Sequence, residues 1–254
     1  MPEINIVNTH QDNVRWMHAS TCKYLINNNV DVWKISVSSN LSLTDSFSAV
    51  LSQDEIARGN RFFYPRDRNR HIITHGALRQ ILGNYLNRAP STIEFGVGIN
   101  KKPFVIDNTG IYFNLSHSGD WILLAIGKSE VGVDTELIKR DFEYSDIVEG
   151  YFSKDEINFI NTGKSAEGFY LLWTRKEALI KATGQGLDEN IKAIPGLVGN
   201  YSLKPDILIS PGHWLITSFN LNEQYIASLA INPTIEEINF LEADFTQWAF
   251  RSNS

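Results

Sequence analysis

The six residues LSQDEI, Leu51 to Ile56, return 101 positions later as FSKDEI, Phe152 to Ile157. At the same offset Ala77 recurs as Ala178, and the strand-like VDVWKISV recurs as VGVDTELI. Short sequence matches occur by chance, so the constant spacing and the constant order of the matches matter more than any single match. The sequence therefore predicts a duplicated unit of about a hundred residues.

Each predicted unit has the same order of elements. An alternating β-branched run favours a strand, and a Ser-x-x-Glu helix start follows, in which the serine caps the helix. A longer helix ends near a glycine, and strands joined by polar turns close the unit, with GIYFNLSHSGDWILLAIG predicted as a hairpin. Because strands and helices occur in runs and not in strict alternation, the expected fold class is α+β.

The duplication predicts two pseudo-symmetric halves, each a small antiparallel-rich sheet packed with helices. The boundary is expected just after Gly127, where GKSEVG is typical of a turn. Residues 1–127 would then form the N-terminal half and residues 128–254 the C-terminal half. A cleft between two such halves is a usual place for a ligand, so we expect the active site there.

Composition limits the class of protein. The chain has 254 residues, 43% hydrophobic and 20% charged, which is typical of a soluble globular protein with one large or two small domains. Its formal net charge of -6 argues against nucleic acid as the partner of the whole chain. Cys22 is the single cysteine, which excludes an internal disulfide and a cysteine-based zinc site. The start MPEINIVNTH lacks signal-peptide features and no apolar run could span a bilayer, so we expect a cytoplasmic protein without a membrane partner.

Three carboxylates occur in the second unit only. By the offset of 101 they replace two apolar residues and a glycine of the first unit: Asp134 for Trp33, Glu136 for Ile35 and Glu177 for Gly76. A requirement of the fold that both units share cannot explain residues that only one unit has. The three carboxylates are therefore candidates for function.

The segment GVDTE places two of these carboxylates two residues apart on a predicted strand. The side chains of Asp134 and Glu136 would point to the same face, roughly 7 Å apart. For an isolated pair, a solvated edge strand is the commoner explanation. A hard cation such as Mg²⁺ is the other explanation, because it suits one or two carboxylates together with water and phosphate. Glu177 as a third carboxylate favours the metal.

The segment FYLLWTRKEALIKATGQG, residues 169–186, is predicted as a largely buried helix with charges in its middle. Steps of three or four residues put Tyr170, Trp173, Glu177 and Lys181 on one stripe. The stripe is compatible with an ordinary surface ion pair between residues four apart. It is also compatible with the wall of a cleft that has an aromatic floor.

Basic and polar residues gather in the first half. They lie in three segments: Arg61, Arg66, Arg68 and Arg70 in RFFYPRDRNR, Lys101 and Lys102 in NKKPF, and Ser116, His117 and Ser118 in NLSHSG. Each of them alone is more often a solvated surface residue. Together with carboxylates in the other half, they predict a phosphorylated ligand held across the cleft by a metal and by Arg or Lys side chains.

These blocks resemble the 4′-phosphopantetheinyl transferases of the larger, pseudo-dimeric Sfp type. GVDTE resembles the family segment G-[IV]-D-[IV]-E, and FYLLWTRKEALIKATGQGL resembles W-[ST]-x-K-E-[AS]-x-x-K. KKPF, FNLSHS and RNRHIITHGALRQIL are similar to its Gly-Lys-Pro, F-N-[IL]-S-H-[ST] and arginine-helix segments, in family order from about residue 50 to 190. Thr135 stands where an aliphatic residue is usual, and Lys101 where glycine is usual, which leaves the adenine contact open.

The resemblance implies a reaction in which coenzyme A and an apo carrier protein give the holo carrier and adenosine 3′,5′-bisphosphate. The nucleophile is then a serine of an acyl or peptidyl carrier protein. The resemblance implies that Asp134, Glu136 and Glu177 bind Mg²⁺, or Mn²⁺ in its place. Glu177 would accept the serine proton directly or through a metal-bound water, and Lys181 would balance charge on the departing phosphate.

The resemblance also implies how coenzyme A is bound. The candidates for gripping its phosphates are Arg70, Lys102, Ser116 and His117, with Arg61 assisting and Lys176 as a second cation for the departing phosphate. Tyr144, Tyr151 and Phe152 are candidates for carrier docking, although core packing is the expected role for each. An internally duplicated site does not require a dimer, so a monomer is expected.

Two other functions stay open at this point. One is a Mg²⁺-dependent phosphohydrolase that uses the same carboxylates with water as the nucleophile. The other is an inactive paralogue that only binds carrier proteins or nucleotides. All three metal positions and Lys181 are present, which argues against the inactive form.

Overall fold

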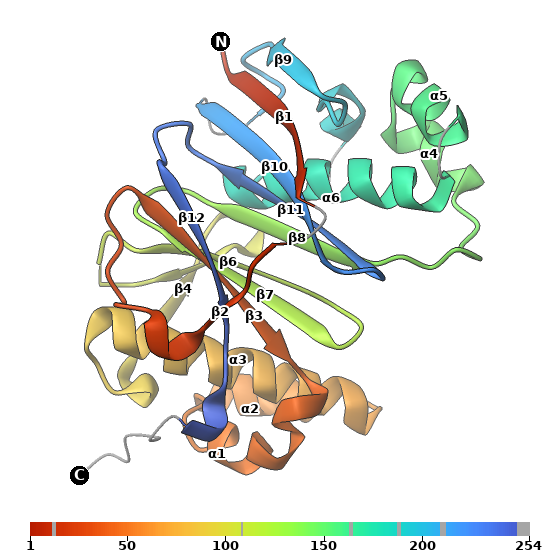
Figure 1. Cartoon of the computed structure of the whole chain (residues 1–254). Coiled ribbons are helices and arrows are strands. Elements are labelled where there is room, and N and C mark those ends of the chain that lie inside the picture. Colours follow the sequence, from red (N-terminus) through yellow and green to blue (C-terminus); the bar gives the residue numbers. More distant parts are fainter. Residues whose placement is uncertain (12–13, 108, 163–164, 187–188, 209–211, 248–254) are drawn as a thin grey trace.

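A computed structural model describes the chain except for residues 12–13, 108, 163–164, 187–188, 209–211 and 248–254. The described elements form four layers, with two sheets in the middle and helices on both outer sides (Figure 1). One apolar cluster joins the sheets, with Val32 and Leu123 from one and Val133 and Phe219 from the other. The predicted α+β class is confirmed.

Both main sheets have five strands. Sheet I has the order β2 (Met17–His18), β12 (Glu237–Glu242), β3 (Asn29–Ser36), β7 (Trp121–Gly127) and β6 (Tyr112–Ser118). Sheet II has the order β8 (Gly132–Leu137), β11 (Tyr225–Ile231), β10 (His213–Asn222), β1 (Glu3–Gln11) and β9 (Gly199–Ser202). A small third sheet pairs β4 (Phe95–Val97) with β5 (Pro103–Val105).

The helices are divided between the two outer layers. Sheet I carries α1 (Thr44–Ser48), α2 (Gln53–Gly59) and α3 (Pro65–Leu86), and sheet II carries α4 (Ser145–Tyr151), α5 (Lys154–Thr162) and α6 (Ser165–Thr183). The predicted hairpin is present as β6 and β7, whose turn contains Gly119 at a φ of +55°. The antiparallel series β3-β7-β6 and β8-β11-β10 are equivalent, as a duplication requires.

The repeated hexapeptides cap equivalent helices. In the first copy Ser52 and Glu55 form a capping box, because the serine hydroxyl accepts from the backbone of Glu55 and the glutamate accepts from the backbone of Ser52. Ser153 and Glu156 make the same two bonds in the second copy. Each box satisfies backbone N–H groups that the first turn of a helix leaves without partners.

Each glutamate of these boxes also pairs with a buried cation of the long helix. Glu55 contacts Arg79 Nε at 2.8 Å, and Glu156 contacts Lys176 Nζ at 3.0 Å. Both cations then donate to two carbonyls of a following loop: Arg79 to Pro90 and Ile93, and Lys176 to Ile191 and Ile194. Arg79 and Lys176 are therefore structural equivalents.

This equivalence corrects the register expected for the long helices. The two helices end at Asn87 and Gly184, which both have a left-handed backbone conformation. Aligning Arg79 with Lys176 also aligns these two end residues. The counterpart of Glu177 is thus Gln80, and the expected pairing with Gly76 was wrong by one helical turn. The first unit has four more residues between its glutamate and its cation, and four residues preserve the face of a helix.

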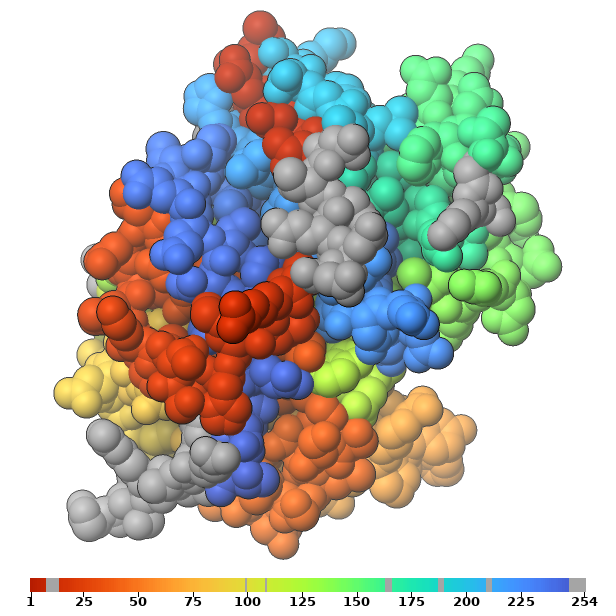
Figure 2. Space-filling model, in the orientation of Figure 1, coloured from red at the N-terminus to blue at the C-terminus, as the bar shows by residue number. Residues whose placement is uncertain are grey.

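The sheets do not follow the expected boundary at Gly127. Strand β1, at the start of the chain, lies in sheet II parallel to β10, and β12, near its end, lies in sheet I parallel to β3. Figure 2 shows the resulting contact between N-terminal residues in red and C-terminal residues in blue. The division into halves 1–127 and 128–254 stays a prediction, with β1 and β12 each exchanged into the sheet of the other half. Without this exchange β10 and β3 would each leave a row of backbone groups unpaired at a sheet edge.

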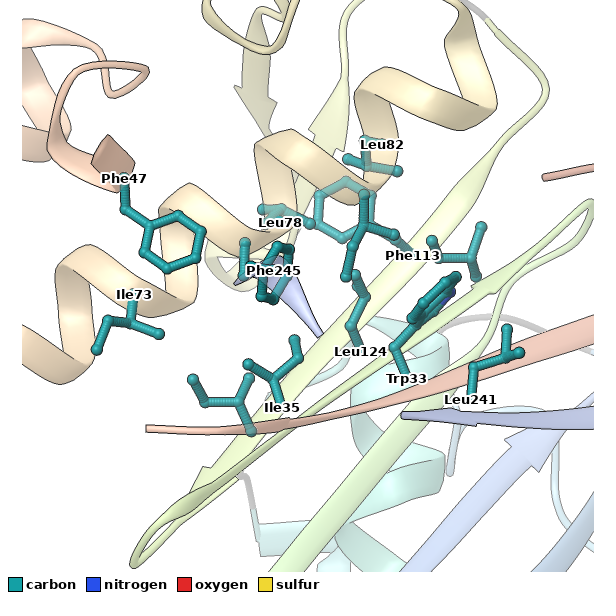
Figure 3. Close-up of a cluster of buried hydrophobic side chains, with 14 of the residues drawn as sticks. Trp33, Ile35, Phe47, Ile73, Leu78, Leu82, Phe113, Leu124, Leu241 and Phe245 are labelled. Atoms are coloured by element: carbon teal, nitrogen blue, oxygen red, sulfur yellow. The ribbon is translucent and has the colours of Figure 1, made fainter. Parts of the chain in front are cut away.

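In the first unit, apolar side chains fill the space between sheet I and its helices (Figure 3). Trp33 and Ile35, the strand counterparts of Asp134 and Glu136, have 0% exposure and pack in the cluster that also contains Phe47. The two carboxylates of the second unit therefore replace core residues of the first, and the fold itself does not need them.

Candidate active site

Strand β8 lies unusually close to helix α6 because residue 132 is a glycine. A Cβ atom at Gly132 would lie 2.0 Å from the carbonyl oxygen of Ala178 and 2.4 Å from the backbone nitrogen of Ala182. This contact brings the next outward-pointing residues of the strand, Asp134 and Glu136, beneath the second half of α6.

A cavity of about 310 Å³ opens where β6, β8 and α6 meet. Its lining is formed by Leu115, Ser116, His117, Asp134, Glu136, Trp173, Glu177 and Lys181. Six of the expected site residues thus come together at the junction of the two sheets. The stripe predicted on the helix faces this cavity, with Trp173 as its aromatic member.

Asp134 is at the centre of the polar contacts. Its Oδ1 atom accepts hydrogen bonds from Lys181 Nζ at 2.6 Å and from Ser116 Oγ at 2.8 Å. Its Oδ2 atom is buried and has no hydrogen-bond partner among the described residues. A buried carboxylate oxygen without a partner is rare in proteins and indicates a missing donor or cation.

Two further carboxylates face this one across the cavity. Burial, and next the negative charge of Asp134, raise the pKa of Glu177 to about 7. Burial and the same charge also raise the pKa of Glu136. Three acids that share one desolvated cavity cannot all ionise easily, and a bound cation relieves this repulsion.

The chemistry of Asp134, Glu136 and Glu177 fits a hard divalent cation, although their side chains are not yet arranged as a coordination shell. No three His, Cys, Asp or Glu groups of the described chain stand close enough to hold a metal ion as they lie. The Lys181 ammonium pairs with Oδ1 of Asp134 and leaves Oδ2 without a partner among the described residues. The unpartnered Oδ2 of Asp134, with Glu136 and Glu177 in the same cavity, provides the all-oxygen donor set that Mg²⁺ prefers.

Ser116 is fully engaged within the protein. Its hydroxyl donates to Asp134, and it accepts from the backbone of Thr135 at 3.2 Å and from Lys181 at 3.1 Å. A hydroxyl has one proton and two lone pairs, and these contacts use all three. Ser116 thus orients Asp134, and its expected contact with coenzyme A stays a prediction.

The cations expected to grip phosphate are not all in one place. His117 lines the cavity, and desolvation, followed by the positive charge of Arg70, lowers the pKa of its imidazole. Arg70 is bound to Asp67 at 3.0 Å, within electrostatic range of His117. Lys102 pairs with Glu130 and donates to the Ala182 carbonyl at the end of α6. Arg61 is exposed, and no described contact brings it to the cavity.

Lys176 does not belong to the site, and its expected role is wrong. Its side chain has 0% exposure, and its ammonium is used by Glu156 and by two loop carbonyls on the other side of α6. Lys176 and Glu177 are neighbours on a helix, so they point about 100° apart. Lys176 fastens α5 and the loop at residues 191–196 to the helix that carries Glu177.

Comparisons with known proteins agree with this arrangement. Residues 130–230 match the family model described as the 4′-phosphopantetheinyl transferase superfamily, and residues 33–129 match the model described as 4′-phosphopantetheinyl transferase, N-terminal. The 4′-phosphopantetheinyl transferase HetI of Nostoc is 32% identical over 179 residues, which cover 68% of this chain and 76% of the relative. The chain belongs to the 4′-phosphopantetheinyl transferase superfamily.

Relatives in bacilli support the same assignment. A 4′-phosphopantetheinyl transferase of Bacillus subtilis is 29% identical over 74% of this chain and 86% of its own length. The 4′-phosphopantetheinyl transferase Sfp of Bacillus subtilis is 28% identical over 56% of this chain and 64% of its own length. The resemblance drawn from the motifs is confirmed.

The transferase also contains supporting residues that sequence reasoning missed. Beneath α6, Thr174 Oγ1 and Ser228 Oγ are 2.9 Å apart, Ser228 and Ser218 are 3.0 Å apart, and Arg175 donates to Ser218 at 2.9 Å. This buried network attaches the active-site helix to β10 and β11. The lone serine within the apolar strand YIASLAI, Ser228, was the available signal.

The aromatic residues considered for carrier docking in this transferase pack in its core. Phe152 has 0% exposure, and Tyr144 and Tyr151 are half-buried in the cluster around Phe169 and Trp173. Core packing, the expected role, is confirmed for Phe152. No helix in the described ranges is long and apolar enough to cross a membrane.

Proposed function

We propose that this chain transfers the 4′-phosphopantetheine group of coenzyme A to a serine of an apo acyl or peptidyl carrier protein. The products are the holo carrier and adenosine 3′,5′-bisphosphate. The observation that carries the proposal is the single cavity in which Asp134, Glu136, Glu177 and Lys181 of one half meet His117 of the other, in a member of this family.

We propose that Asp134, Glu136 and Glu177 hold Mg²⁺, or Mn²⁺ in its place. When bound, the ion supplies positive charge to the pyrophosphate of coenzyme A and neutralises the charge that develops at phosphorus. The unpartnered buried oxygen of Asp134 and the raised pKa values of both glutamates support this donor set.

Glu177 and Lys181 are the proposed catalytic pair. The serine oxygen forms the new bond to phosphorus as the bond to adenosine 3′,5′-bisphosphate breaks, and the serine proton passes to the Glu177 carboxylate. Glu177 lines the cavity beside Asp134 and Glu136, which places a general base there. Lys181, one turn further along α6, offsets the negative charge of the departing bisphosphate.

We propose that the nucleotide part of coenzyme A lies along the end of α6. His117 and Arg70 would bind phosphate oxygens, which also holds the imidazole in its charged form. A second cavity, of about 470 Å³, has Thr183 and Gly184 in its lining together with Lys102 and apolar side chains of β5 and β6. This cavity is the proposed place of the adenine.

The proposal also covers localisation, oligomeric state and the alternative reaction. We propose a cytoplasmic enzyme that acts as a monomer, since both halves of its site belong to one chain. A phosphohydrolase would use the same carboxylates, but the family assignment favours transfer to a carrier. Which carrier proteins are served is a question for the assay below.

The deciding experiment incubates the protein with coenzyme A, Mg²⁺ and a panel of apo carrier proteins, and measures intact carrier mass. We expect the mass of phosphopantetheine on the carrier serine, and no product after chelation of the metal. Glu177→Gln should reduce the rate by roughly 10² to 10⁴-fold if Glu177 is the base.

The matched control is Glu223→Gln, which makes the same change at an exposed hairpin turn and should transfer normally. Release of adenosine 3′,5′-bisphosphate without carrier modification would instead establish the phosphohydrolase. Unchanged transfer by Glu177→Gln would overturn the assignment of the base.

A further inference from the structure

Strand β8 lies at an edge of sheet II (Figure 1). Side chains of β6 cover this edge. Three backbone N–H groups of β8 donate to three side chains of β6: Val133 to Asn114 Oδ1 at 2.9 Å, Thr135 to Ser116 Oγ at 3.2 Å and Leu137 to Ser118 Oγ at 3.0 Å. The contacts repeat at every second residue of both strands, the period of β-structure. The side chains thus replace the strand that this edge lacks.

Two of these side chains also hold the carboxylates of the active site. Ser116 donates to Asp134 Oδ1 and Ser118 donates to Glu136 Oε2, both at 2.8 Å. Each serine hydroxyl therefore donates its proton to a carboxylate of β8. The same hydroxyl accepts a hydrogen bond from the backbone N–H of the next residue of β8 after that carboxylate. A hydroxyl used in both directions fixes a carboxylate relative to its own backbone.

We infer that Asn114, Ser116 and Ser118 form a clasp through which the first half positions the metal carboxylates of the second half. Ser118 is the positioning residue for Glu136. Among the described residues Ser118 is the only hydrogen-bond donor to Glu136. This inference rests on the proposed function, because it assigns a purpose to the orientation of the same carboxylates.

The clasp acts against the repulsion between Asp134 and Glu136. Without the hydroxyl of Ser118, the side chain of Glu136 would be free to turn away from Asp134 toward solvent. Loss of a group that orients a metal ligand typically weakens metal binding by about 10- to 100-fold. Among the described residues Asn114 bonds to the backbone of Val133 and to no carboxylate, so its share is to keep the two strands in register.

The test compares substitutions at Ser118 by direct titration with Mn²⁺, with free Mn²⁺ measured by electron paramagnetic resonance. Ser118→Val and Ser118→Thr have nearly the same shape and differ by one hydroxyl. We expect Ser118→Val to raise the dissociation constant for Mn²⁺ by about 10- to 100-fold and Ser118→Thr to stay near wild type. Ser118→Ala, which adds no bulk, should behave like Ser118→Val and serves if the valine variant does not fold.

The matched control is Ser38→Ala. Ser38 also donates its hydroxyl to a carboxylate, Asp120 Oδ2 at 2.8 Å, but neither Ser38 nor Asp120 lines the cavity. It should bind Mn²⁺ like wild type. In the transfer assay Ser118→Val should need more Mg²⁺ for half-maximal rate, with an unchanged KM for the carrier.

Two results would overturn the inference and are distinguishable. Folded Ser118→Val and Ser118→Ala that bind Mn²⁺ as tightly as wild type would show that the clasp has no effect on the carboxylates, and the proposed function would stand. Wild-type protein that binds no Mn²⁺ would remove the metal site itself, and the proposed function with it.

Discussion

Glu177 combines two properties that are separate in most proteins: it is desolvated, and it faces two other carboxylates. Burial first, and then Asp134, raise its pKa to about 7, above the value of an unfolded chain. At Glu177 the metal-free folded state therefore binds more protons than the unfolded state between about pH 4.5 and 7. The contribution of Glu177 to stability should fall as the pH rises through this range, and a bound cation should reverse the effect.

This shift predicts a pH dependence of metal binding. Since a ligand carboxylate must lose its proton, the affinity for Mg²⁺ should rise with pH through about 7 and then level off. Calorimetry in buffers with different ionisation enthalpies should detect proton release at pH 6.5. Glu177→Gln should reduce that release, and a flat wild-type profile would contradict the role given to Glu177.

Lys176 and Lys181 lie on the same helix and predict opposite phenotypes. Lys176→Ala leaves Glu156 buried and unpaired, so it should lower the free energy of unfolding by about 3 to 5 kcal/mol. Lys181→Ala should instead lower kcat, because Lys181 lines the cavity. Urea unfolding and initial transfer rates, measured on both variants, check this contrast.

The control for this pair is Lys128→Ala at an exposed turn, which should change stability by no more than about 0.5 kcal/mol. A large loss of transfer by properly folded Lys176→Ala, without loss of stability, would return Lys176 to the active site.

At the scale of elements, the site depends on the distance between β8 and α6. Gly132→Ala would place a methyl group 2.0 Å from the Ala178 carbonyl, so the helix must move away from the strand. Overpacking of this kind costs about 1 to 3 kcal/mol. It should also separate Glu177 from Asp134, and we expect transfer to fall by more than the loss of folded protein explains.

Gly150→Ala is the matched control, because nothing lies within 4 Å of a Cβ atom at that position of helix α4. It should leave transfer unchanged and slightly increase stability, since alanine is the better helix former. Thermal unfolding and transfer rates of the two alanine variants are the measurements. Equal behaviour of the two would contradict the importance of the close approach.

The sequence predicted the elements better than their relation to one another. Capping at Ser52 and Ser153 was predictable because a cap depends on a few neighbouring residues. Asp134, Glu136 and Glu177 were predictable as a group because one unit has them and the other does not. The register of the helices was not, because a slip of four residues keeps Ala77 and Ala178 on a matching face.

The roles of single polar residues were the least predictable part of the site. Lys176 and Lys181 differ in function because of what packs on each face of α6, which one helix sequence does not state. Ser116 was expected to bind phosphate, and its contacts with Asp134, Thr135 and Lys181 were not predicted. Such assignments depend on contacts between segments far apart in the chain.

At the scale of the whole molecule, the exchanged strands predict that the halves are not independent. Residues 1–127 alone would lack β12 beside β3, and residues 128–254 alone would lack β1 beside β10. Each fragment, expressed alone, should be largely unfolded or aggregated, because an exposed sheet edge promotes pairing with other chains. Co-expression should restore a soluble complex with transfer activity.

Circular dichroism, size-exclusion chromatography and the carrier mass assay measure these outcomes. The intact chain should unfold in urea in one transition, with the same midpoint for tryptophan fluorescence and for circular dichroism. Two separated transitions, or a well-folded single fragment, would show that the halves are autonomous domains.

The position of β1 also constrains the order of events on the ribosome. Glu3 pairs with His213, which is synthesised roughly 200 residues later, about 10 to 40 s at usual elongation rates. During that interval the segment has no strand to pair with. Nascent chains should therefore acquire the protease resistance of sheet II only after β10 has left the ribosome, and β1 is until then a natural binding site for ribosome-associated chaperones.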